Sequence, residues 1–232
     1  MAKAKYLEIL DSLRTRCASM PIGARLDSER TLAGQFGVSV MTVRHSLDHL
    51  VEEGWAKKLP GSGTYVSRPT ISMGPSLTSF SEDMRQRGFT PSSRVMRVET
   101  VRPDVATIGV LSLRPGESAV LVERLRSADN EPMCHEVSLF PPSLAPFLLS
   151  ADLSGSIHEL LAGHSITPHS VERAVRAVQA SNRESDLLEL PRGCPALEIV
   201  DTFYDSLGRP MQHVLSRYRF DRYEVRSDIH RA

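Results

Sequence analysis

Apolar residues recur at helical spacing in three segments near the start of the chain. The first stripe consists of Tyr6, Ile9, Leu10, Leu13 and Cys17. Residues three and four positions apart share one helix face, so this stripe predicts a helix that M20-P-I-G23 ends. Similar patterns predict a second helix over about 28–36 and a third over about 40–53. The third helix has an apolar face made of Val43, Leu47 and Leu50. Thr42 and Arg44 then lie on its outward side.

The residues between and after these helices predict a turn and a hairpin. Gly37 permits a tight turn, and the hydroxyl of Ser39 can satisfy free amides at the start of the third helix. Trp55 opens an extended segment, which G61-S-G63 turns back into a second strand. The order helix, turn, helix, hairpin across residues 26–66 is typical of a winged helix-turn-helix that reads DNA.

The rest of the chain alternates short helices and strands. Helices are predicted near residues 80–87, 104–110, 156–163 and 181–189. Strands are predicted near residues 95–101, 119–127, 133–140, 170–178, 196–204 and 211–219. Tight turns such as A128-D-N-E131 and S206-L-G208 join consecutive strands. We therefore expect an antiparallel sheet with peripheral helices, an α+β fold.

A segment rich in Pro, Gly, Ser and Thr, and without periodicity, separates the two patterns. It is interpreted as an interdomain linker over residues 69–76. The expected domains are therefore a DNA-binding domain over residues 1–68 and a second domain over residues 77–232. A chain of 232 residues is long enough for two such domains, each with its own core.

Charge and cysteine content narrow the class of protein. The net charge of zero conceals an asymmetry: residues 1–68 hold ten basic and seven acidic residues, whereas residues 69–232 hold 18 and 21. The excess of three positive charges in the first block suits DNA binding. Three dispersed cysteines and the lack of a signal-like or long apolar segment predict a cytoplasmic protein without a membrane span. No metal or cofactor motif is present, so we expect neither group.

The motifs also resemble a known family. Residues 26–66 resemble the DNA-binding domain of the GntR family of bacterial regulators. Residues 79–91, R124-L-R126 with Glu136, and residues 218–223 resemble the UTRA effector-binding domain of the HutC branch. Within that branch the resemblance is greatest to repressors that respond to N-acetylglucosamine 6-phosphate. It implies a chorismate lyase-like fold for the second domain. A homodimer is expected because one winged domain offers few base contacts and two symmetric copies double them.

The resemblance implies six DNA-binding residues: Arg30, Ser39, Val40, Thr42, Arg44 and Gly61. Arg44 can present its guanidinium fork to a guanine edge in the major groove. Arg30, Ser39 and Thr42 are expected to meet phosphates. Val40 departs from the family, where many members have arginine, and could contact a thymine methyl group instead. The operator sequence therefore cannot be taken from the family.

Eight further residues are candidates for binding the effector: Ser79, Ser81, Arg124, Arg126, Glu136, Ser156, His158 and Gln212. For Ser79 and Ser81, helix capping is an equal alternative to ligand contact. Arg124 and Arg126 lie two apart on a predicted strand, so both leave the same face and can hold an anion between them. In related sensors such arginines, with a serine matching Ser156, bind the effector's phosphate, and an acid matching Glu136 bonds sugar hydroxyls. His158 and Gln212 stand where those sensors commonly have tyrosine and glutamate.

These features predict a repressor that binds a pseudo-palindromic operator as a homodimer and is released by a small phosphorylated metabolite, with an amino-sugar phosphate favoured. Because guanidinium groups also bind phosphonates and carboxylates, a regulator that senses a phosphonate metabolite or a urocanate-like acid remains an alternative. An enzyme of the lyase type is the other alternative. No recognisable nucleophile with a base supports it.

Overall fold

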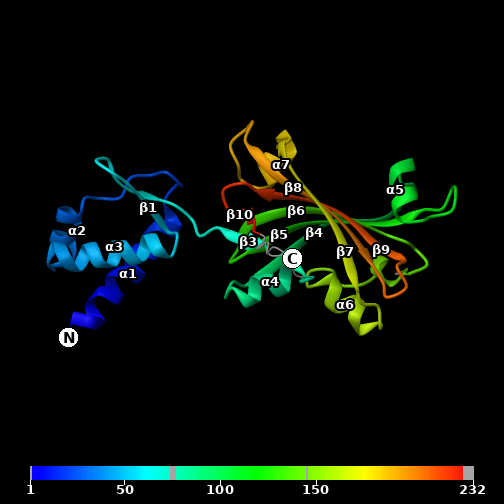
Figure 1. Ribbon diagram of the computed structural model, residues 1–232, viewed down its shortest axis with the longest axis horizontal. Coiled ribbons are helices and arrows are strands. Elements are labelled where there is room, and N and C mark those ends of the chain that lie inside the picture. Colours follow the sequence, from blue (N-terminus) through cyan, green and yellow to red (C-terminus); the bar gives the residue numbers. More distant parts are fainter. Residues whose placement is uncertain (1, 74–76, 145, 227–232) are drawn as a thin grey trace, which may run out of the picture. The chain divides into compact units, whose positions relative to one another are not determined.

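The computed structural model describes residues 2–73, 77–144 and 146–226, and it divides into two compact units (Figure 1). Unit 1 comprises Met1–Ile71 and unit 2 comprises Ser72–Ala232. Among the described residues, no helix has the length and apolarity that a membrane crossing requires.

Unit 1 consists of three helices followed by a hairpin. Its elements are α1 (Ala2–Ser19), α2 (Glu29–Phe36), α3 (Val40–Glu52), β1 (Ala56–Leu59) and β2 (Gly63–Val66). The predicted apolar stripes meet in one core formed by Ile9, Leu10, Leu13, Cys17, Leu26, Leu32, Ala33, Val43, Leu47, Leu50, Ala56 and Val66. Strands β1 and β2 pair antiparallel, with Leu59 opposite Gly63, which confirms the predicted hairpin.

Two serine caps and one glycine shape the turn between α2 and α3. Ser28 and Ser39 begin the two helices, and each hydroxyl accepts from an amide three residues later, at 3.1 Å. Gly37 has φ 63° and ψ 39°, the left-handed conformation that an L side chain strains to adopt. The predicted turn and the predicted capping role of Ser39 are thus confirmed.

Unit 2 is built on a six-stranded antiparallel sheet with the order β4-β5-β6-β9-β8-β7. Its strands are β4 (Pro91–Val101), β5 (Ala119–Ala128), β6 (Glu131–Phe140), β7 (Ser170–Gln179), β8 (Pro195–Tyr204) and β9 (Pro210–Arg219). The central strands β5, β6 and β9 are mostly buried, whereas β4 and β7 form exposed edges. The expected α+β class with an antiparallel sheet is confirmed.

Short helices surround this sheet. They are α4 (Phe80–Gln86), α5 (Val105–Val110), the 3-10 helix η1 (Pro146–Leu149), α6 (Ile157–Gly163) and α7 (Asn182–Leu187). Helices α4 and α6 lie on one side of the sheet and α7 on the other (Figure 1). Alternation along β5 sends the side chain of Arg124 to the α4 and α6 side and that of Glu123 to the α7 side, where it meets Arg183.

The expected linker is the main difference from the sequence-based prediction. Ile71–Met73 form a strand, β3, which pairs with another unpredicted strand, β10 (Tyr223–Val225). Residues 74–76 of the expected linker lie outside the described residues. Strands of three residues carry too little periodicity to be recognised in the sequence. The edge strand β4 also begins at Pro91, four residues earlier than expected, because a proline is tolerated at the first position of an edge strand.

Candidate functional site

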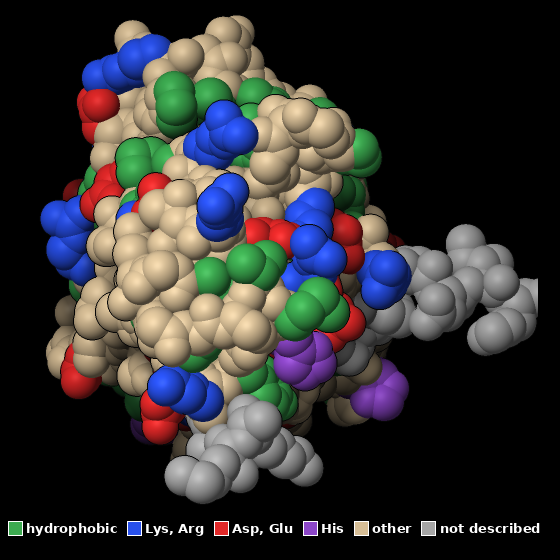
Figure 2. Space-filling view, turned by 90° about the vertical axis from the view of Figure 1, so that its left-hand side faces the viewer, with side chains coloured by type: hydrophobic (Ala, Val, Ile, Leu, Met, Phe, Trp, Pro, Cys, Tyr) green, Lys and Arg blue, Asp and Glu red, His purple; other side chains and the backbone are tan. Residues whose placement is uncertain are grey.

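In unit 1, three of the predicted DNA-binding residues line one open groove. Arg30 on α2, Val40 at the start of α3 and Gly61 at the hairpin tip border it. Figure 2 shows Lys and Arg side chains dispersed over a face of the molecule, several of them beside Asp and Glu side chains, and not gathered into one patch. Such a surface offers separate points of contact with DNA, as expected for a DNA-binding domain with a modest positive charge.

Arg44 is held in place by a neighbouring acid. Its Nε and Nη2 donate to one carboxylate oxygen of Glu29, at 2.9 and 2.8 Å. Glu29 raises the pKa of Arg44 through these hydrogen bonds, so the guanidinium remains charged. The side chain is about half exposed and lies at the surface, where it was expected. The ion pair fixes one edge of its fork, a feature that the sequence pattern did not reveal.

The remaining predicted contacts surround the beginning of α3. The hydroxyls of Ser39 and Thr42 lie 2.9 Å apart at the first turn. Next to them Val40 and Met41 are exposed, at 38% and 65% of their surface. The helix therefore presents two hydroxyls and an apolar tip, where a family arginine would give a cation.

Close packing at the hairpin tip requires one of its glycines. Gly63 has φ 132°, and a Cβ placed there would lie 3.0 Å from Nε of Arg25. Gly61 has φ 71° with open space around it. Gly63 thus admits the Arg25 side chain, while Gly61 shapes the exposed turn.

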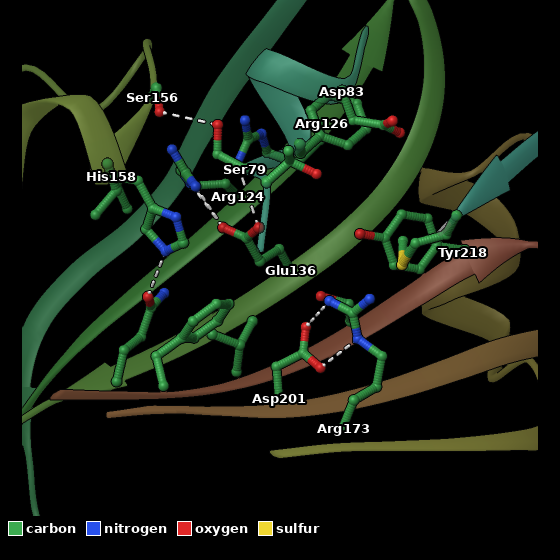
Figure 3. Close-up of a pocket in the computed structure, with 18 of the residues that line it drawn as sticks. Ser79, Asp83, Arg124, Arg126, Glu136, Ser156, His158, Arg173, Asp201 and Tyr218 are labelled. Carbon is green, nitrogen blue, oxygen red and sulfur yellow. Dashed lines mark hydrogen bonds and ion pairs between the residues drawn. The ribbon is translucent and has the colours of Figure 1, made fainter. Parts of the chain in front are cut away.

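In unit 2, a pocket lies on the sheet face beside α4 and α6 (Figure 3). Seven of the eight predicted effector-binding residues line it: Ser79, Arg124, Arg126, Glu136, Ser156, His158 and Gln212. The eighth, Ser81, accepts a hydrogen bond from Nη2 of Arg126 at 2.8 Å. Residues from three strands and two helices, separated by as many positions as Ser79 and Gln212, therefore meet in one site.

Glu136 joins the two arginines of the pocket. Arg124 and Glu136 are register partners on β5 and β6, and Arg124 donates from Nε and Nη2 to one carboxylate oxygen. Arg126 donates from Nη1 to the other oxygen at 3.2 Å. Nη1 of Arg124 also donates to the backbone carbonyls of Leu153 and Gly155. The three charged groups are buried and oriented by one another.

The arginine pair keeps Glu136 ionised despite its burial. Burial by itself would raise the carboxyl pKa, but the charges and hydrogen bonds of Arg124 and Arg126 lower it from 4.5 to about 2. Both carboxylate oxygens are therefore engaged by cations. To bind sugar hydroxyls as expected, Glu136 would have to accept hydrogen bonds from them at the same oxygens that already accept from the two arginines.

The cluster retains one positive charge and one unsatisfied donor. Two guanidinium groups and one carboxylate sum to +1, and burial lowers the pKa of His158, which leaves that ring neutral near pH 7. Among the described residues, Nε of Arg126 has no hydrogen-bond partner. The Arg126 guanidinium also lies 4.6 Å over the ring of Phe80. A buried, uncompensated cation of this kind favours an anion.

Two serines border the same end of the pocket. Ser79 caps α4 and Ser156 caps α6, each accepting from an amide three residues later. The hydroxyl of Ser156 donates to that of Ser79 at 3.4 Å. The two hydroxyls lie beside Arg124 and Arg126 (Figure 3), so a group bound by the arginines would also reach them.

His158 and Gln212 form a neutral polar pair. Nε2 of His158 and Oε1 of Gln212 are 3.0 Å apart, and Nε2 of Gln212 donates to the hydroxyl of Ser138 at 3.1 Å. Because the amide oxygen only accepts, His158 is the donor in this bond. The His158 ring also meets Phe203 edge to face at 4.8 Å. The pair contributes no formal charge to the pocket.

The sequence pattern missed several residues that line this pocket. The charged ones are Asp83 on α4, and Arg173 on β7 with Asp201 on β8, which face the cavity as an ion pair (Figure 3). Tyr218 and Tyr223 lie nearby, and burial raises the pKa of both hydroxyls well above 10. Period-2 alternation indicated which residues share a strand face, but not that β9 pairs with β6, which places β8 and β7 in the same sheet as β5 and β6.

Comparison with known families assigns both halves of the chain. Residues 5–66 match the family described as bacterial regulatory proteins, gntR family. Residues 86–224 match the UTRA domain. The first match covers the helix-turn-helix with its hairpin, and the second covers all six strands of the large sheet, while Ser79 and the rest of the α4 side of the pocket precede it.

Individual proteins match along nearly the whole chain. The HTH-type transcriptional repressor NagR of Bacillus subtilis is 34% identical over 222 residues, covering 94% of this chain and 91% of that protein. The mannosyl-D-glycerate transport/metabolism system repressor MngR of Escherichia coli is 28% identical, covering 96% of this chain and 94% of that protein. The crystal structure of PhnF from Mycobacterium smegmatis has the same fold, with a TM-score of 0.75 and 24% identity, over 95% of this chain and 98% of that one.

Proposed function

Because the chain belongs to the gntR family of bacterial regulatory proteins and carries a UTRA domain, we propose that it is a repressor released from its operator by a small phosphorylated metabolite. The family assignment makes it a transcriptional regulator and not an enzyme, which agrees with the resemblance inferred from its motifs. An amino-sugar phosphate is the favoured effector. The repressor binds a pseudo-palindromic operator as a homodimer.

The observation that carries the effector proposal is the uncompensated positive charge in the pocket. Arg124 and Arg126 are 2% and 3% exposed, and among the described residues the acid that pairs with both of them is Glu136. The unsatisfied Nε of Arg126 offers a further donor. A phosphate oxygen could accept from this donor and from the hydroxyls of Ser79 and Ser156 together. These features support a tetrahedral anion at this end of the pocket.

The similar proteins support repression and leave the identity of the effector open. Two of them are named as repressors, and one of these is named for a sugar-derivative transport and metabolism system. In this chain the neutral His158–Gln212 pair replaces a tyrosine and a carboxylate of the resembling sensors. This difference favours a second candidate, a regulator of the same design that senses a phosphonate metabolite or a urocanate-like acid.

The proposal for DNA binding rests on unit 1. Its groove joins Arg30, Val40 and Gly61, and Arg44, Ser39 and Thr42 lie on the exposed part of α3. A single head of this size provides few base contacts, and a symmetric pair doubles them. Analytical ultracentrifugation at micromolar concentration should show a dimer that binds one palindromic duplex. A monomer that binds DNA one to one would contradict the homodimer.

The test of effector control is the substitution Arg126→Ala. A sugar phosphate that lowers operator affinity in the parent protein should have no effect in this variant, while operator affinity without ligand stays nearly unchanged. The matched control is Arg85→Ala, which removes an exposed arginine on α4 that pairs with Glu159 at the surface. Fluorescence anisotropy of a labelled operator, with and without ligand, measures both properties.

The reciprocal measurement checks the coupling itself. A ligand shifts DNA binding only through different affinities for two states of the protein, so operator DNA must weaken ligand binding by the same factor. Release of Arg126→Ala from DNA at the parent's ligand concentration would show that the effector binds elsewhere. The thermal midpoint of each variant shows whether unit 2 remains folded.

A further inference from the structure

A second charged pair lies in the effector pocket, away from the two central arginines. Nε and Nη2 of Arg173 donate to the two carboxylate oxygens of Asp201, at 2.7 and 2.8 Å. The two residues are register partners on β7 and β8, so both side chains leave the sheet on the same face. Figure 3 shows this pair on the opposite side of the pocket from Ser79 and Ser156.

Asp201 has more unused hydrogen-bond acceptor positions than Glu136. Glu136 accepts three N–H bonds from two arginines, whereas the oxygens of Asp201 each accept one bond from Arg173. An ionised carboxylate has about four acceptor positions. The side chains of Arg173 and Asp201 keep 20% and 13% of their surface exposed, against 10% for Glu136. Donor and acceptor positions therefore remain side by side at the cavity wall.

The space between the two charged groups is lined by weakly polar and apolar side chains. His158 and Gln212 face it, with Phe203 and Val214 beside them. A ligand anchored by its anionic group at Arg126 would extend along these neutral side chains toward Asp201. Polar groups at its far end would then replace water at the ion pair.

We propose that Arg173 and Asp201 form a second recognition point of the effector site, one that binds a neutral group with adjacent donors and acceptors, such as vicinal hydroxyls. The inference rests on the proposed function of the pocket and adds the chemistry of the ligand's far end. The ion pair has no net charge, so a charged group would be attracted by one member and repelled by the other. A hydroxyl pair can accept from Arg173 and donate to Asp201 without that conflict.

This arrangement selects a class of effector. Polyhydroxylated phosphates, such as sugar phosphates, satisfy both ends of the pocket. A compact anion, such as methyl phosphate, satisfies only the arginine end. The site then distinguishes sugar phosphates from compact anions by the hydrogen bonds that the ligand makes with Arg173 and Asp201. A ligand without hydroxyls leaves the remaining donor and acceptor positions of these partly buried groups unpaired.

Isothermal titration calorimetry of the full chain tests the proposal. The probes are N-acetylglucosamine 6-phosphate, glucose 6-phosphate and methyl phosphate. The parent should bind at least one sugar phosphate more tightly than methyl phosphate. Asp201→Asn and Arg173→Gln should lower that sugar phosphate's affinity by about tenfold to a hundredfold and leave methyl phosphate affinity unchanged.

The matched control is Arg176→Gln on the same strand. Arg176 pairs with Glu198, its register partner, on the opposite face of the sheet. The control should leave the affinity of every probe unchanged, which separates a ligand contact from a general loss of β7–β8 pairing. Arg173→Lys keeps the charge but loses the two-bond fork, so its sugar phosphate affinity should fall between those of the parent and Arg173→Gln.

The outcomes distinguish this inference from the proposed function. Equal affinity of the parent for all three probes, or equal losses for sugar phosphate and methyl phosphate in Asp201→Asn, would overturn the second recognition point while the anion site stands. If no probe binds the parent, the phosphate-binding proposal and the second recognition point both fail. If the Asp201→Asn variant has a lowered thermal midpoint but parental affinities, the Arg173–Asp201 pair stabilises the β7–β8 pairing and does not contact the ligand.

Discussion

An arginine–glutamate pair occurs in each unit, and the two pairs contrast in their surroundings. On unit 1, Glu29 accepts two N–H bonds from Arg44, whose side chain is 49% exposed. In the pocket of unit 2, Glu136 accepts two N–H bonds from Arg124, whose side chain is 2% exposed. In both pairs the arginine donates from Nε and Nη2 to one carboxylate oxygen, but only the second pair is buried, and its acid also accepts a bond from Arg126.

Under the proposed function, the same chemistry would serve two kinds of recognition. An exposed pair can exchange its partner for another anion or a base edge at small cost, because water and salt already weaken it. A buried pair cannot lose a partner without leaving a charge in a medium that solvates it poorly. The reading head is therefore expected to tolerate substitutions that the pocket does not.

The largest expected effect is that of Glu136→Gln. It leaves two buried guanidinium groups without a counter-charge, and we expect unit 2 to lose about 3–5 kcal/mol of stability. Glu29→Gln should change the thermal midpoint of unit 1 only slightly. Scanning calorimetry gives both midpoints, and fluorescence of Trp55, the single tryptophan, reports unit 1 separately. A comparable loss from both substitutions would remove the contrast.

The second largest expected effect is a loss of stability of unit 2 at acidic pH. The pKa of Glu136 is lowered from 4.5 to about 2 in the folded protein, so its stabilisation is complete above about pH 4.5 and is lost as pH falls toward 2. The loss is on the order of 3 kcal/mol. Near-ultraviolet circular dichroism follows the buried Tyr218 and Tyr223 of unit 2. In Glu136→Gln this part of the acid dependence should be absent.

Arg44→Ala should lower operator affinity by about tenfold to a hundredfold, as expected for a lost bidentate base contact. The matched control is Arg14→Ala. Arg14 pairs with Glu53 at the other end of α3, away from the groove. Anisotropy titrations at fixed salt concentration measure both variants. Parental affinity in Arg44→Ala would show that its bond to Glu29 is structural only.

The smallest effect expected is that of Ser39→Ala. The substitution removes the hydroxyl that caps α3 and should lower the stability of unit 1 by about 1 kcal/mol, followed by Trp55 fluorescence. Ser39→Asn retains a capping oxygen and should restore that stability. If operator affinity falls in Ser39→Ala but the stability does not, the hydroxyl contacts DNA without contributing to the fold.

The sequence predicted unit 1 more completely than unit 2 because unit 1 depends on local signals. The Gly37 turn, the Ser39 cap and the hairpin glycines each act within a few residues. The pocket depends instead on which strands are neighbours. The sequence placed Arg124 and Arg126 on one face, but their shared bond to Glu136 and the Arg173–Asp201 pair follow from strand order and register.

Two short strands show the same limit. Ile71–Met73 was interpreted as part of a linker because three residues show no period, and its partner Tyr223–Val225 lies about 150 residues further along the chain. The sequence pattern of either segment alone does not predict a pairing over such a separation. The resemblance to a family identified the effector-binding candidates, although their roles in binding remain predictions.

The carbonyl contacts of Arg124 have a consequence for the speed and specificity of sensing. Arg124 is fixed by Glu136 and by the backbone of Leu153 and Gly155, so its rotamer is set when unit 2 folds. A side chain that is already ordered loses no further conformational entropy when a ligand arrives, and its donors do not have to reorganise. If a ligand presents its anionic group at a different angle, the Arg124 side chain cannot reorient to follow that group. Arg124 therefore presents its remaining donor positions in one fixed direction to any group that enters the pocket.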